Sequence, residues 1–97
     1  MSKWLVERKL SEAGERLRQL RGELGVVDEQ LAFLADAADD ARLRAMVSET
    51  PMSDREHREA QKHADAMSRH RAQLVTQIAE LEKSQDELLE RLFAEQA

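Results

Sequence analysis

The chain has 97 residues, of which 36% are charged and 41% apolar, with three aromatic residues and no cysteine. A chain of this length holds at most one average domain, which excludes a two-domain enzyme. The absence of cysteine excludes disulfides and thiolate metal sites. High charge combined with few aromatic residues is typical of long-helix and coiled-coil proteins.

The charge balance and the first residues indicate which ligands and which cellular location to expect. A net charge of -5 disfavours nucleic acid as a ligand, because nucleic-acid binders usually carry a basic excess. The N-terminal stretch is charged from Lys3 onward and lacks the apolar run of a signal peptide. No segment approaches the ~20 apolar residues of a membrane span. We therefore expect a soluble cytoplasmic protein with no membrane association.

The first half of the chain carries one long heptad array. Its apolar residues recur at alternating steps of four and three over more than five heptads, which predicts a coiled-coil seam. The array consists of Val6, Leu10, Ala13, Leu17, Leu20, Leu24, Val27, Leu31, Leu34, Ala38, Ala41 and Ala45.

A break follows at residues 48–53, around the only proline of the chain, Pro51. Thr50 precedes the proline and is therefore disfavoured in helical conformation. Ser53 and Glu56 have the spacing of a capping box, which predicts the start of a second helix. We predict a single hairpin over 1–97, with helices at about 3–47 and 54–94 and a turn at 48–53.

The second half carries a matching array with the same alternating steps. A short connection makes the two helices antiparallel neighbours, so the numbers of facing residues sum to a constant. A sum of 105 centres the turn between Met52 and Ser53, and a sum of 98 centres it at Glu49. We favour 105, because it pairs more leucine with leucine. The array consists of His57, Ala60, Ala64, Met67, Arg71, Leu74, Ile78, Leu81, Gln85, Leu88 and Leu92.

Two polar residues, Arg71 and Gln85, occupy seam positions of the second helix. Single polar residues at such positions commonly fix the register or the oligomeric state of a coiled coil. The Arg71 side chain is long enough to extend its head group to an acidic neighbour. The alternative is that Arg71 binds an anion.

A second, incomplete apolar stripe lies outside the seam. It predicts a contact surface for a protein partner, foremost a second copy, so that two hairpins would form a homodimeric four-helix bundle. The alternative is that the end of the chain tucks onto its own neighbouring helix. The stripe consists of Trp4, Leu5, Val26, Phe33, Val75, Leu89 and Phe93.

No nucleophile, phosphate-loop or metal motif occurs in the sequence. We therefore expect no enzymatic activity, no catalytic residue, no cofactor, no metal and no small-molecule substrate. Asp36, Asp39 and Asp40 form an acidic group that we expect near the hairpin tip. These residues could hold a hard cation, pair with basic residues of the second helix, or simply face solvent.

The stretch from Asp40 to Pro51, followed by Arg55 to Met67, resembles small coiled-coil proteins of actinobacteria, a resemblance that implies no activity. The hairpin shape with acidic tip residues is also similar to transcript-cleavage factors, although their globular second domain is missing. Some actinobacterial anti-sigma hairpins bind a cyclic dinucleotide through a motif that requires arginine where this chain has Gly14 and Glu87. That ligand is therefore not expected.

These features predict a non-enzymatic protein–protein interaction module or a small regulatory adaptor that acts through a coiled-coil hairpin. The alternative is a transcription regulator that contacts RNA polymerase or a sigma factor through the hairpin. This alternative rests on shape and analogy alone.

Overall fold

Two long helices form this protein. The computed structural model describes the backbone of residues 2–96 and the side chains of residues 2–94. Helix α1 spans Lys3–Ser48 and helix α2 spans Pro51–Gln96, and no strand occurs in the described range. Only Glu49 and Thr50 connect the helices. The predicted all-α, antiparallel two-helix hairpin is therefore confirmed.

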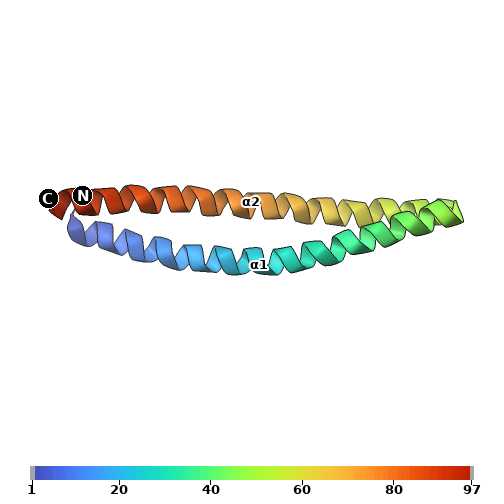
Figure 1. Ribbon diagram of the computed structural model, residues 1–97, viewed down its shortest axis with the longest axis horizontal. Coiled ribbons are helices and arrows are strands. Elements are labelled where there is room, and N and C mark those ends of the chain that lie inside the picture. Colours follow the sequence, from blue (N-terminus) through green and yellow to red (C-terminus); the bar gives the residue numbers. More distant parts are fainter. Residues whose placement is uncertain (1, 97) are drawn as a thin grey trace. The chain divides into compact units, whose positions relative to one another are not determined.

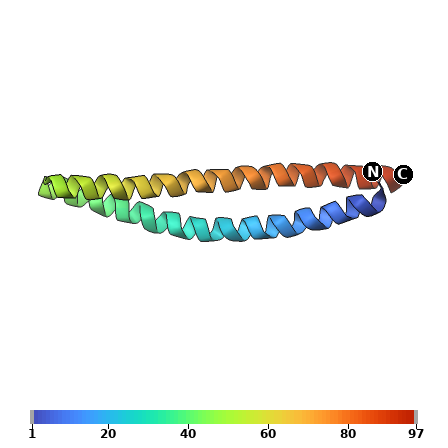
Figure 2. The ribbon, with the colours of Figure 1, turned by 180° about the vertical axis from the view of Figure 1, so that it is seen from behind.

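The chain divides into two units. The terminal unit combines residues 2–24 of the start of the chain with residues 74–96 of its end, and the turn unit comprises residues 25–73. Within each unit, the α1 segment and the α2 segment lie side by side and run in opposite directions, as both views show (Figures 1 and 2). Each unit has its own part of the seam.

The seam of the terminal unit contains the largest buried side chains of the molecule. Leu17 and Leu20 are 2% exposed and Val6 is fully buried. Every position of the predicted arrays in this unit is buried or half-buried, which confirms the heptad assignment. These positions are Val6, Leu10, Ala13, Leu17, Leu20, Leu24, Leu74, Ile78, Leu81, Gln85, Leu88 and Leu92.

The seam of the turn unit is built mainly from small side chains near the turn. Alanine leaves room for close approach of the backbones, and the two ribbons draw together toward the turn in both views (Figures 1 and 2). The array positions are again all buried or half-buried. They are Val27, Leu31, Leu34, Ala38, Ala41, Ala45, His57, Ala60, Ala64, Met67 and Arg71.

The prediction that Ser53 begins the second helix is wrong, because α2 starts at Pro51, with Thr50 as its N-cap. The Thr50 hydroxyl accepts a hydrogen bond from the Ser53 backbone N–H at 3.1 Å, and the Ser53 hydroxyl accepts one from the Thr50 backbone N–H at 3.2 Å. This is a capping box with serine in place of glutamate. Pro51 takes the first helical position, where no backbone N–H is needed.

The favoured register, with a sum of 105, is also wrong. The turn at residues 49 and 50 centres the hairpin on a sum of 98 to 99, the alternative register. The Asp28 carboxylate contacts the Arg71 guanidinium, and these residue numbers sum to 99. Ser53 is only 8% exposed, as its place opposite Ala45 in this register requires. The expected gain in leucine pairs is wrong as well, because each register pairs three leucines of the first array with three of the second. Chain connectivity at the two-residue turn therefore selects the register.

Candidate interaction surface

The seven residues predicted to form a contact surface are all exposed to solvent. The three aromatic residues have the largest exposed fractions of the seven, with Phe33 74% exposed and Trp4 and Phe93 each 64% exposed. Trp4, Leu5, Val75, Leu89 and Phe93 belong to the terminal unit, whereas Val26 and Phe33 belong to the turn unit. Each unit therefore presents apolar side chains that the seam does not use.

Trp4 contacts a basic side chain of its own helix. The Arg8 guanidinium lies 5.5 Å from the centre of the indole ring. This is the geometry of a cation–π contact between residues one turn apart. The exposed fraction of Trp4 shows that most of the indole surface still faces solvent.

Phe33 forms one wall of an open groove in the turn unit. The groove has a volume of about 440 Å³, and its lining comprises Glu29, Gln30, Phe33 and Leu34 of α1 and Met67 of α2. Leu34 and Met67 are seam residues whose outer edges remain half-exposed. The groove therefore combines an apolar floor with one carboxylate at its edge.

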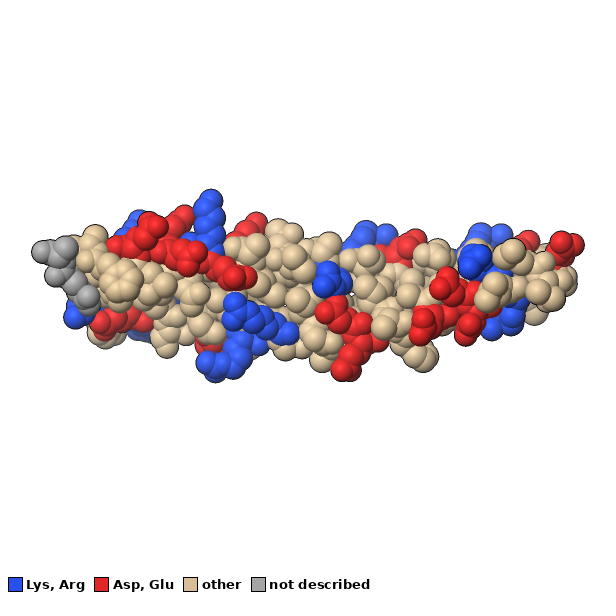
Figure 3. Space-filling model, viewed as in Figure 1, with Lys and Arg blue, Asp and Glu red and all other residues tan. Residues whose placement is uncertain are grey.

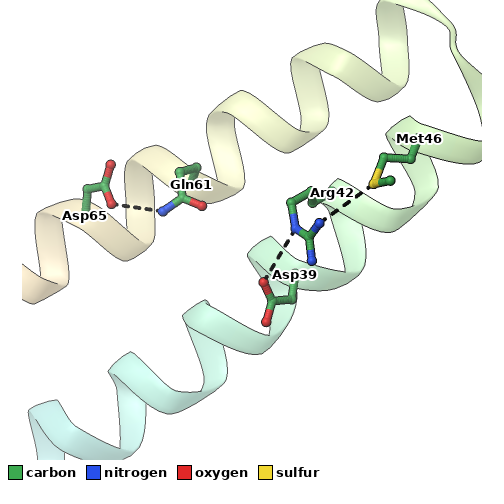
Figure 4. Close-up of polar contacts among 5 residues, drawn as sticks. All are labelled: Asp39, Arg42, Met46, Gln61 and Asp65. Atoms are coloured by element: carbon green, nitrogen blue, oxygen red, sulfur yellow. Dashed lines mark hydrogen bonds and ion pairs between the residues drawn. The ribbon is translucent and has the colours of Figure 1, made fainter.

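A second exposed apolar group surrounds the turn and was missed by the sequence analysis. Leu43, Met46, Val47 and Met52 are each more than half exposed. Val47 shares the heptad position of Phe33, whereas Leu43, Met46 and Met52 do not, so periodicity alone did not group these four residues. The Met46 sulfur accepts a hydrogen bond from Arg42, and Arg42 also approaches the Asp39 carboxylate at 3.9 Å (Figure 4).

The acidic group is not at the tip. Asp40 precedes the end of α1 by eight residues, which corresponds to about 12 Å along the helix. Asp39 pairs with Arg42 of its own helix, and across from it Gln61 bonds to Asp65 within α2 (Figure 4). Asp36 and Asp40 are exposed. The turn itself carries one exposed acidic residue, Glu49, beside the exposed apolar side chains of Val47 and Met52.

Arg71 leaves the seam as the sequence suggested. Its guanidinium donates to the Asp28 carboxylate at 2.5 Å, with both side chains close to half exposed. Gln85 is half-buried at its seam position. That Arg71 and Gln85 fix the register remains a prediction.

The charges of the chain are ordered in blocks: residues 1–21 hold six basic and three acidic residues, and residues 80–97 hold two basic and six acidic residues. On the face shown in Figure 3, acidic side chains gather over the C-terminal part of α2, and basic side chains lie over the adjoining part of α1. Within the turn unit, acidic side chains lie over the α1 segment in the view of Figure 3. Two ion pairs cross between the helices in the described part of the chain, Arg21 with Glu82 and Arg71 with Asp28.

Comparison with known proteins gives no further guide. The chain matches no family model, no curated protein and no solved structure. Neither helix has a stretch that is long and apolar enough to cross a bilayer within the described residues. The same residues contain no group of three or more His, Asp or Glu side chains placed to hold a metal ion.

Proposed function

We propose that this chain is a non-enzymatic protein–protein interaction module, and that one of its partners is a second copy of the same chain. The observation that carries the proposal is the exposure of Phe33, Trp4 and Phe93, all of the aromatic side chains, on a hairpin with a single seam. Aromatic side chains are enriched among the residues that dominate binding energy at protein interfaces. Exposed apolar groups with polar rims mark interaction sites.

A hairpin of two helices has a further reason to associate. One seam of a small domain rarely supplies more than ~3–5 kcal/mol of stability. Packing two hairpins against each other covers a second face of each helix, as in four-helix bundles. The homodimer and the role as a regulatory adaptor both belong to this proposal.

Capture from the native host tests the function. A tagged chain should recover an untagged copy of itself and its host partners, identified by mass spectrometry. The triple variant W4Q/F33Q/F93Q should lose them, whereas a matched triple variant in exposed polar residues, Q73A/Q77A/S84A, should retain them. Equal recovery by both triple variants would remove the basis of the proposal.

A further inference from the structure

The groove beside Phe33 lies in the most acidic part of the chain. Between Gly22 and Ala41, α1 carries six acidic residues and no lysine or arginine. Of these acids, only Asp28 and Asp39 form ion pairs among the described side chains. Glu29 itself lines the groove. An occupant of this groove should therefore be apolar at its centre and basic at its edge.

The chain carries such a segment itself. Residues 1–21 hold six basic and three acidic residues. Leu5 is 40% exposed, and Lys9 lies one turn further along the same face of α1. Four of the six basic side chains already have ion-pair partners, whereas Lys9 and Arg16 have none among the described residues. Lys9 is therefore available to a carboxylate on another molecule.

We propose that the groove is the docking site for the basic N-terminal segment of α1, residues 3–21, from a second copy of the chain. The inference rests on the proposed function and specifies its partner and geometry. The Leu5 side chain of one copy packs against Phe33 and Met67 of the other, and the Lys9 ammonium lies beside the Glu29 carboxylate. Opposite charges at the rim then select the orientation.

The two α1 helices run antiparallel in this arrangement. With Leu5 opposite Phe33, an antiparallel partner brings Lys9 opposite Glu29, whereas a parallel partner brings it opposite Ala37. The pairing is also reciprocal, because residue 33 of each copy faces residue 5 of the other. A reciprocal contact closes after two copies and forms a dimer rather than a filament.

Charge reversal tests the ion pair. Lys9→Glu and Glu29→Lys should each weaken self-association at least about threefold, because each replaces an attraction by a repulsion across the interface. An equimolar mixture of the two variants should form heterodimers with close to wild-type affinity, measured by sedimentation velocity with one variant fluorescently labelled. Glu90→Lys, which changes the net charge equally at an exposed site of the terminal unit, should leave the affinity unchanged.

Disulfide formation between introduced cysteines tests the proposed docking geometry. The chain has no cysteine of its own that could compete with the introduced pair. Lys9→Cys on one copy and Gln30→Cys on another should form a mixed disulfide under mild oxidation. Ser11→Cys, on the other side of the same helix, should not pair with Gln30→Cys.

The outcomes separate the two proposals. A dimer that tolerates both charge reversals and forms the Ser11 disulfide as readily as the Lys9 disulfide overturns this docking geometry but leaves self-association standing. A chain that is monomeric at every concentration overturns both.

Discussion

At the scale of single residues, the turn carries the one unusual backbone conformation. Glu49 has a φ of 50°, in the left-handed region, and its N–H donates to the Ala45 carbonyl at 3.0 Å. This is the left-handed C-terminal motif of an α-helix, in which glycine is the preferred residue. A side chain in this region costs roughly 1–2 kcal/mol.

Glu49→Gly should therefore stabilise the hairpin by about 0.5–1 kcal/mol, after allowance for the larger entropy of glycine in the unfolded chain. The midpoint of urea unfolding is the measurement. Ser48→Gly, inside the last turn of α1, is the matched control and should lower the midpoint instead. A lower midpoint for Glu49→Gly would show that the left-handed conformation is not the one adopted in solution.

Arg71 occupies a seam position, but its charged head group extends out of the seam to Asp28. Its ion pair with Asp28 is close to half exposed, so the pair itself contributes only ~0.2–1 kcal/mol. We expect its larger role to be in opposing the alternative register, in which its head group would lose Asp28.

Arg71→Leu should consequently retain or raise the stability of the hairpin while allowing a mixture of registers, because leucine suits the seam in both. Distances between spin labels at Asp36 and Lys62 report the register. We expect one narrow distribution for the wild-type chain and two for the variant. A single distribution in the variant would assign the register to the turn alone.

At the scale of elements, the sequence predicted the seam and missed the exact turn. Every position that the heptad steps assign to the arrays is buried or half-buried. A two-helix seam buries residues spaced alternately three and four apart, which is why this pattern could be read from the sequence. The capping box was misplaced, because Ser53-Asp-Arg-Glu matches the usual pattern, whereas Thr50 bonds to a serine. The Ser2 hydroxyl caps α1 by accepting a hydrogen bond from the Leu5 N–H at 3.2 Å. Because serine is a preferred N-cap residue, this cap could have been predicted from the sequence.

The surface could be predicted only as a set of residues. Heptad positions showed that Val26 and Phe33 lie outside the seam, and both are exposed. The groove beside Phe33 could not be predicted, because it depends on which α2 residue lies across from it, and the favoured register placed Met67 opposite Ala38. The apolar group around the turn depends likewise on where α1 ends.

The capping box yields a test of the turn. Thr50→Ala should cost about 1 kcal/mol of stability, since it leaves the Ser53 N–H without its partner. Ser53→Ala should cost a comparable amount, and the double variant should cost less than the sum, because the two hydroxyls act on each other. Thr76→Ala, at an exposed position within α2, serves as the control and should change little. Additive losses would mean that the capping box does not form.

The three glycines of α1 bear on helix stability alone. A Cβ atom added at Gly14, Gly22 or Gly25 would meet nothing within 4 Å. Each glycine-to-alanine change should therefore stabilise the helix by up to ~1 kcal/mol, measured by thermal unfolding. None of the three lies on the face that carries Leu5, Lys9 and Phe33, so the dimer affinity should stay constant. A loss of affinity in Gly25→Ala would place a close helix contact on a different face from the one proposed.

At the scale of the whole molecule, the three aromatic residues of the chain lie on its surface rather than in the seam. The seam is made mainly of aliphatic residues and alanine, and none of the three residues Trp4, Phe33 and Phe93 enters it. The charges are ordered in blocks of opposite sign along the chain. We propose that the side chains left outside the seam, Phe33 first among them, are covered by another molecule of the same protein.

Sedimentation equilibrium over a wide range of concentrations tests that claim most directly. We expect a mass of twice the 11.1 kDa of the chain for the wild type, with dissociation to the single-chain mass on dilution. Phe33→Gln should shift this dissociation to concentrations roughly tenfold higher or more, as expected for loss of a central aromatic anchor. A wild-type chain that sediments as a monomer at every concentration, or a Phe33→Gln variant as tightly dimeric as the wild type, would contradict it.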